Sequence, residues 1–134
     1  MLVVVLTSKQ EVLCLLRADY PDFWQSVTGS LMEGETPQEA AVRELCEETG
    51  LQSTDGELVD CHHSEYFRIY PQWLHRYAPG VTVNLEHVFC FVMTACQDIC
   101  ISHEHIKYCW LSKEEAIRIM ASPSNQSAIK NFVK

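Results

Sequence analysis

The sequence has few basic side chains and no long apolar run. Only 10 Lys and Arg residues accompany 18 Asp and Glu residues in the 134-residue chain, so the formal net charge is −8. This balance argues against a protein that follows a nucleic-acid backbone, because that task requires a basic surface. No apolar stretch approaches the roughly 20 residues that cross a lipid bilayer. We therefore expect neither nucleic acid nor membrane as a partner.

The seven cysteines do not form a recognisable metal or disulfide framework. Their number is odd, and no two are spaced as Cys-x-x-Cys. A zinc site built around Cys61 or Cys109 with neighbouring histidines would lack the usual ligand spacing. We expect reduced, partly buried thiols. Residues 1–6 lack a basic start and are too short for a signal peptide, so we expect a first strand and a cytoplasmic location.

Apolar periodicity and breaker residues predict strands that alternate with helices in one domain over residues 1–134. There are no internal repeats, linkers or low-complexity tracts. A mixed sheet covered by helices follows, which is an α/β fold. The expected strands are a hairpin of 2–6 and 11–17, a short strand within 22–28, then 58–64, 65–69 and 86–95, with a short apolar end at 110–111. The expected helices are 37–48, one capped by Ser112 that ends near 120, and 126–133, and residues 71–79 are expected to form an irregular loop.

An unusual concentration of acid marks residues 33–48. Glu44, Glu47 and Glu48 stand at i, i+3 and i+4, so they share one face near the end of the predicted helix. Mutual repulsion and the helix macrodipole both disfavour anions there. A hard divalent cation would relieve this tension, and Mg²⁺ or Mn²⁺ suits an all-oxygen site. The alternative is a solvated acidic face, which would not explain Gly29 or Arg43.

Residues 29–51 resemble the Nudix box, Gly-x5-Glu-x7-Arg-Glu-U-x-Glu-Glu-x-Gly-U, in which U is aliphatic. The matching residues are Gly29, Glu35, Arg43, Glu44, Leu45, Glu47, Glu48, Gly50 and Leu51. The resemblance implies a Nudix-type α/β/α sandwich with a mixed β-sheet. It also implies a hydrolase that cleaves phosphoric anhydrides with the help of a divalent metal.

The glutamates of the box are the expected catalytic and metal-binding residues. Glu44 and Glu48, one turn apart, can share a cation. Glu47 either completes the coordination or accepts a proton from the attacking water. We expect Arg43 to point away from this face, and the resemblance suggests that it pairs with Glu35 and so fixes the loop to the helix.

Three flanking segments, 22–30, 75–82 and 104–111, resemble the bacterial dihydroneopterin triphosphate pyrophosphohydrolases of folate biosynthesis, which are also described as dATP pyrophosphohydrolases. The resemblance implies a small pterin or nucleoside triphosphate as substrate, with the monophosphate and pyrophosphate as products. One alternative is a housekeeping pyrophosphatase for dATP or oxidised nucleotides. Another is a Nudix-fold sensor that binds a nucleotide without cleaving it, although such sensors are expected to lose box glutamates that are present here.

The same resemblance assigns further site residues. Glu104 matches another metal ligand, and the general base is left open between Glu104 and Glu47. The expected substrate-binding residues are Arg17, Thr28, Phe67, Arg68, Ile69, Tyr70 and Ser122. Arg17 could instead be a solvated strand end, and the aromatic residues could belong to the core. Arg76 is either a phosphate contact or a loop anchor, and the oligomeric state is left open.

Overall fold

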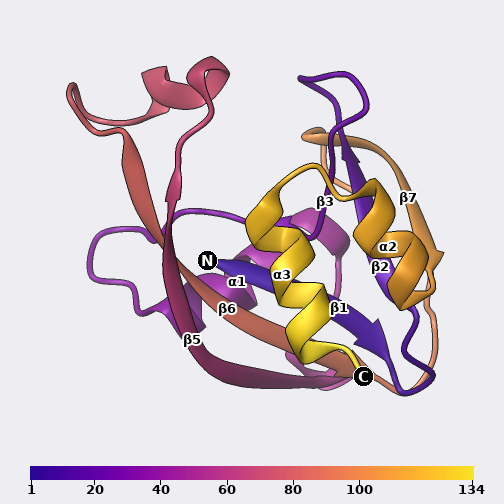
Figure 1. Cartoon of the computed structure of the whole chain (residues 1–134). Coiled ribbons are helices and arrows are strands. Elements are labelled where there is room, and N and C mark those ends of the chain that lie inside the picture. The colour runs from indigo at the N-terminus through magenta and orange to yellow at the C-terminus, as the bar shows by residue number, and fades with distance from the viewer.

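The computed structural model describes residues 1–134, which form one mixed sheet with helices on both sides (Figure 1). The strands are β1 (Leu2–Thr7), β2 (Val12–Arg17), β3 (Trp24–Gln25), β4 (Val27–Thr28), β5 (Glu57–Arg68), β6 (Val83–Met93) and β7 (His105–Leu111). The helices are α1 (Pro37–Thr49), α2 (Lys113–Ile119) and α3 (Pro123–Phe132), with short 3-10 helices η1 (Ser53–Asp55) and η2 (Pro71–Arg76). None of these helices is long and apolar enough to cross a bilayer.

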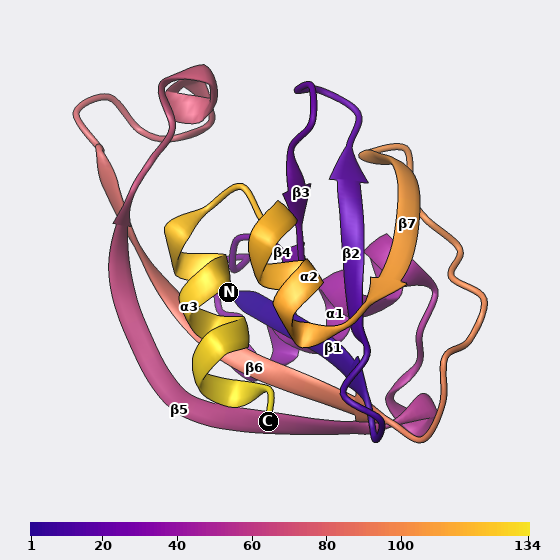
Figure 2. The ribbon, with the colours of Figure 1, turned by 45° about the vertical axis from the view of Figure 1, so that its right-hand side comes forward.

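Strand β1 lies at the centre of the sheet and joins its two parts. It pairs in parallel with β6 along its whole length, from Leu2↔Val88 to Thr7↔Met93. On its other edge it pairs antiparallel with β4 at one end and with β2 at the other. The sheet order is β3-β2-β1-β6-β5, and β7 pairs with β2. Figure 2 shows the consequence: β5 and β6 rise as one arm, and β2, β3 and β7 rise as a second arm.

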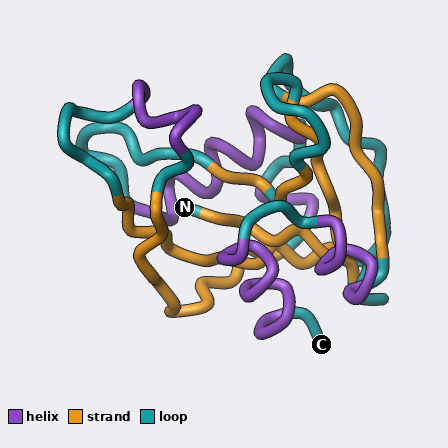
Figure 3. Tube along the Cα trace, turned by 45° about the horizontal axis from the view of Figure 1, so that its top comes forward, coloured by secondary structure: helices purple, strands orange, loops and turns teal.

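Both faces of the sheet are buried, and this explains why β1 is apolar at every position. Val3 and Val5 pack in a cluster that includes Leu45 of α1, whereas Leu2 and Val4 pack in a second cluster with α2 and α3. A strand covered on both faces has no polar side to present. In Figures 1 and 3 the helices accordingly lie on opposite sides of the sheet. The predicted α/β/α sandwich with a mixed β-sheet is confirmed.

The predicted elements are mostly present, but two of the strands differ from expectation. The hairpin of β1 and β2 pairs only at Leu6↔Val12, because the two strands then diverge into separate arms. Strand β7 extends back to His105, whereas only residues 110–111 were expected to be extended. Its exposed side chains, such as Ile106 (65% exposed), hide the alternation that marks a half-buried strand.

Two other segments are more regular than the sequence suggests. Residues 71–76, expected to be an irregular loop, form η2. Helix α3 begins at Pro123 rather than at 126, because Ser122 caps it and Pro123 occupies the first helical position. A proline is a breaker inside a helix but is favoured at its start, so the expected boundary was wrong by one turn.

Candidate active site

Helix α1 is held at both ends by the residues that the sequence indicated. The Thr36 hydroxyl accepts from the Glu39 amide (3.1 Å), and the Glu39 carboxylate accepts from the Thr36 amide (3.0 Å). Gly50 ends the helix in the left-handed conformation, with φ of 74°. The last turn contains no basic residue. The helix therefore presents its terminal glutamates without the cations that normally stabilise a helix C-terminus.

Arg43 fixes the preceding loop to α1. Its Nε and Nη2 groups donate to the two carboxylate oxygens of Glu35 at 2.8 and 2.9 Å, and Nη2 also donates to the Ser30 carbonyl oxygen at 3.0 Å. These bonds from Arg43 lower the pKa of Glu35 to about 2. A two-pronged contact of this kind fixes orientation as well as distance.

The expectation that Arg43 points away from the glutamate face was wrong. Its Nη1 group donates to Glu44 at 2.8 Å and to Glu47 at 3.3 Å. Arg43 and Glu47 are four residues apart and so are neighbours on the helix surface. The long guanidinium side chain therefore reaches both the loop and the glutamates, and it offsets part of their repulsion.

Glu48 is the most constrained carboxylate of the site. It is only 1% exposed, and neither of its oxygens has a hydrogen-bond partner. Burial, reinforced by Glu44, raises the pKa of Glu48 to about 10. His105 Nε2 lies 3.8 Å from Glu48 Oε1 but accepts from Gln25 Nε2 (3.1 Å), and burial lowers the pKa of His105 to about 4. At neutral pH both groups are therefore uncharged in the absence of a cation, so this contact is not an ion pair.

The surroundings of Glu48 fit a divalent cation. Two buried acceptors without donors are costly, and a cation bound by ionised Glu48 and Glu44 would remove this cost. Gly29 leaves the space that the Glu44 carboxylate needs, since a Cβ at this position would collide with the Glu44 carboxyl group. The structure does not gather three carboxylates into a complete ligand set.

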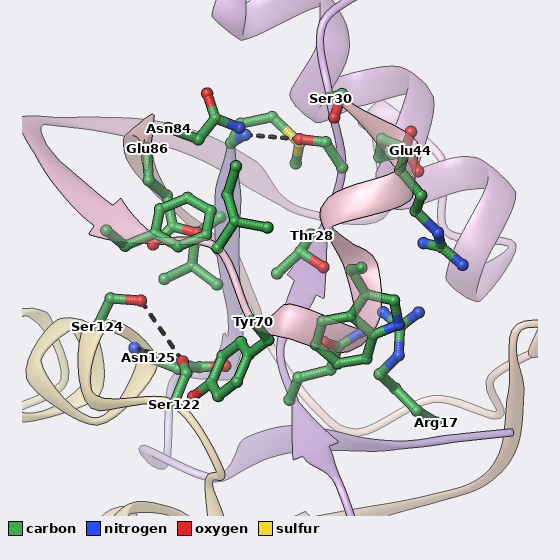
Figure 4. Close-up of a pocket in the computed structure, with 18 of the residues that line it drawn as sticks. Arg17, Thr28, Ser30, Glu44, Tyr70, Asn84, Glu86, Ser122, Ser124 and Asn125 are labelled. Atoms are coloured by element: carbon green, nitrogen blue, oxygen red, sulfur yellow. Dashed lines mark hydrogen bonds between the residues drawn. The ribbon is translucent and has the colours of Figure 1, made fainter. Parts of the chain in front are cut away.

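A pocket of about 270 Å³ opens beside this end of α1 (Figure 4). The site residues that the sequence predicted and the structure places in its wall are Arg17, Thr28, Glu44, Phe67, Ile69, Tyr70, Glu104 and Ser122. They come from β2, β4, α1, β5 and its following segment, the turn before β7, and the N-cap of α3. Residues up to 105 positions apart in the chain thus meet in one cavity.

Three predicted site residues lie outside the pocket wall. Glu48 is buried behind it. The side chain of Glu47 is 56% exposed and faces Arg43. Arg68 lines an adjacent groove together with Tyr66, Phe67 and Pro71.

Sequence reasoning missed about half of the pocket wall. The additional residues are Met1, Leu2, Phe23, Gln25, Ser30, Trp73, Tyr77, Asn84, Glu86, Ser124 and Asn125. One signal was available: polar Asn84 and Glu86 alternate along β6 just before its continuous apolar run. The aromatic residues gave no such signal, since their grouping depends on contact between loops.

Arg17 is held in the pocket wall by a cluster of loop residues. Its Nε and Nη2 groups donate to Asp19 at 2.7 and 2.8 Å, and its guanidinium carbon lies 4.3 Å from the centre of the Trp73 ring. Trp73 Nε1 also donates to Asp19 (3.0 Å), and Phe23 packs edge-on against Trp73. Nη1 of Arg17 makes no hydrogen bond, and the side chain is only 10% exposed. Arg17 is therefore not a solvated strand end.

Arg76 also belongs to this arrangement. Its Nη2 group lies 3.5 Å from Asp19, and the residue lines the pocket. The contact with Asp19 supports the role of loop anchor, since it ties η2 to the β2–β3 loop. The hydrogen bonds from Arg17, with the one from Trp73, hold the pKa of Asp19 well below its usual range.

Comparisons with known proteins agree with this geometry. The family model described as NUDIX domain matches residues 1–132. The dihydroneopterin triphosphate diphosphatase of Escherichia coli (strain K12) is 42% identical over 135 aligned positions, which cover 99% of this chain and 89% of that protein. The protein of the same description from Haemophilus influenzae is 40% identical, with 98% and 85% covered. The structure of the E. coli dihydroneopterin triphosphate pyrophosphohydrolase superposes with a TM-score of 0.94 at 44% identity, covering 98% of this chain and 92% of that one.

Proposed function

Because the chain belongs to the NUDIX domain family, we propose that it hydrolyses dihydroneopterin triphosphate to the monophosphate and pyrophosphate, with residues 1–134 as one hydrolase domain. One observation carries the proposal: the pocket wall contains Glu44, with the unpartnered carboxylate of Glu48 buried one helical turn away, and Arg17, which has a free donor. The similarity to proteins of this activity over nearly the whole chain supports the choice of substrate.

The glutamates would hold the metal. Glu44 and Glu48 are the proposed primary ligands of Mg²⁺, or of Mn²⁺ in its place, and Glu104 is a further ligand from across the pocket. A cation bound there would neutralise charge on the phosphoryl oxygens and make a water molecule more acidic. Glu47, which is exposed and paired with Arg43, is placed to complete the site or to accept a proton from water.

Arg17 and Thr28 would orient the triphosphate. Nη1 of Arg17 is the free donor of a guanidinium that is already fixed by Asp19 and Trp73, so little side-chain freedom is lost when phosphate binds. The Thr28 hydroxyl lies at the end of β4, next to Gly29. Phe67, Ile69 and Tyr70 would line the space for the ring, and Ser122 would contact the substrate near α3.

The proposal is tested by a pyrophosphate-release screen with Mg²⁺ over dihydroneopterin triphosphate, dATP and 8-oxo-dGTP. The expected result is the highest kcat/KM for dihydroneopterin triphosphate, with the monophosphate as the second product. A clear preference for dATP or 8-oxo-dGTP would instead support the housekeeping pyrophosphatase. Tight binding of a nucleotide without any hydrolysis would support the sensor.

A further inference from the structure

One wall of the pocket carries two polar side chains from one strand. Asn84 and Glu86 stand two residues apart on β6, so they project from the same face of the strand, and both line the pocket. In Figure 4 they lie across the cavity from Glu44 and Arg17. Their place across the cavity suits contact with the ring of a triphosphate substrate rather than with its phosphates.

One oxygen of the buried Glu86 carboxylate lacks a donor. Glu86 is 7% exposed, and its Oε1 atom has no hydrogen-bond partner. The Met1 ammonium lines the same pocket and donates to the Gly29 carbonyl oxygen at 2.7 Å. Both this ammonium and the Ser124 hydroxyl favour the ionised form of Glu86 without bonding to Oε1. An unsatisfied buried oxygen costs free energy, and a ligand that supplies the missing donor removes this cost.

Asn84 offers the complementary function. Its Oδ1 atom accepts from the Leu85 amide (2.9 Å), and its Nδ2 group makes no hydrogen bond. Asn125 in the same wall differs, since both ends of its amide bond to Ser26 at 2.8 and 3.0 Å. Asn125 therefore positions α3, whereas Asn84 has a donor available for a ligand.

We infer that Glu86 and Asn84 recognise the 2-amino-4-oxo-pyrimidine edge of the substrate ring, an inference that rests on the proposed function. This edge presents two adjacent N–H donors, from the amino group and ring N3, followed by the oxygen at position 4. The Glu86 carboxylate accepts from the two donors, and the Asn84 amide donates to the oxygen. Adenine presents a ring acceptor beside its single amino group and leaves Glu86 unsatisfied. Guanine carries the same edge as a pterin and shares this recognition.

The test compares Glu86→Gln with the wild type on dihydroneopterin triphosphate, dGTP and dATP. Gln keeps the shape of the side chain but replaces one acceptor with a donor. We expect kcat/KM to fall about 10- to 100-fold for dihydroneopterin triphosphate and dGTP, mainly through KM, because a charged hydrogen bond to the ring is lost. The dATP value should change less than about 3-fold. Glu57→Gln, an exposed glutamate on β5, is the matched control and should leave all three values unchanged.

Metal-free binding of neopterin, followed by its fluorescence, separates this inference from the proposed function. Glu86→Gln should weaken neopterin binding about 10-fold or more, and Asn84→Ala should weaken it less. Equal losses on all three triphosphates, or unchanged neopterin binding in a variant with wild-type Tm, would overturn the inference. If the wild type fails to hydrolyse dihydroneopterin triphosphate, the proposed function fails, whereas neopterin binding still decides the role of Glu86.

Discussion

The two ends of the pocket are held by different kinds of interaction. At the α1 end, Arg43 is the one cation in direct contact with Glu35, Glu44 and Glu47, and Glu48 is buried with no donor at all. At the β6 and α3 end, neutral hydrogen bonds such as those of Asn125 with Ser26 hold the wall, and one acidic side chain has a free oxygen. At the first end, repulsion between glutamates and the burial of Glu48 favour the binding of a divalent cation. At the second end, free donors and acceptors favour a ring with complementary groups. We therefore expect damage at the first end to slow chemistry and damage at the second to alter which ring is bound.

The sharpest way to separate the two ends is Glu48→Gln. Removing a buried metal carboxylate should lower kcat by about three orders of magnitude. Metal-free Tm at neutral pH should stay near the wild-type value, because the raised pKa keeps Glu48 uncharged there and Gln has nearly the same shape. Steady-state kinetics with Mg²⁺ and circular dichroism melting measure both effects. Neopterin binding should be unchanged, and near-wild-type turnover would remove Glu48 from the metal site.

Gly29→Ala disturbs the same end of the pocket by steric clash and changes no charge. A Cβ at this position collides with the Glu44 carboxyl group, so the carboxylate must move. We expect kcat to fall about 100-fold, since small displacements at a catalytic centre are costly.

Gly34→Ala provides the matched control for this substitution. Gly34 has φ of +78° and no atom within 4 Å of an added Cβ. The change should cost about 1 kcal/mol of stability through backbone strain and leave kcat within about 2-fold. Equal losses of activity in the two alanine variants would contradict the collision with Glu44.

The raised pKa of Glu48 also predicts that the stability and its increase by Mg²⁺ depend on pH. The pKa of Glu48 is raised from 4.5 to about 10 in the folded, metal-free protein. Its contribution to stability is therefore complete below pH 4.5 and is lost as the pH rises through about 10. Mg²⁺ requires the ionised carboxylate, so the rise in Tm caused by saturating Mg²⁺ should be larger at about pH 9 than at about pH 6. Scanning fluorimetry measures the shift, which should lose this pH dependence in Glu48→Gln.

The smallest effect is expected at the border between the two ends, in Asp19→Asn. Asp19 joins Arg17, Trp73 and Arg76. The amide cannot accept both bonds from Arg17, so Arg17 loses part of its orientation toward phosphate. We expect KM to rise about 3- to 10-fold with kcat nearly unchanged. Substrates with different rings should be affected alike, and a change in ring preference would show that Asp19 acts on the ring end instead.

The α1 end of the pocket could be predicted because the residues that form it are neighbours in sequence. The cap at Thr36 and the stop at Gly50 follow from spacing on one helix, and the resemblance to the Nudix box supplied the pairing of Arg43 with Glu35. The i, i+4 spacing of Arg43 and Glu47 also allows their contact, contrary to the expectation that Arg43 points away from the glutamates. The rest of the pocket wall could not be predicted in this way. Phe23 and Trp73 are fifty residues apart, and they meet only because the β2–β3 loop packs against η2.

By itself the sequence determined the α/β/α architecture and the glutamate-rich helix, because periodicity, caps and i, i+4 contacts act over a few residues. Only the tertiary structure decided that Glu48 is buried without a partner, that Arg17 is fixed against Trp73, and that Asn84 and Glu86 face the same cavity. Burial and the meeting of distant segments are properties of the packed chain. Burial and contacts between distant segments set the pKa of a carboxylate and decide which donors and acceptors stay free. Neither can be deduced from one short segment of the sequence.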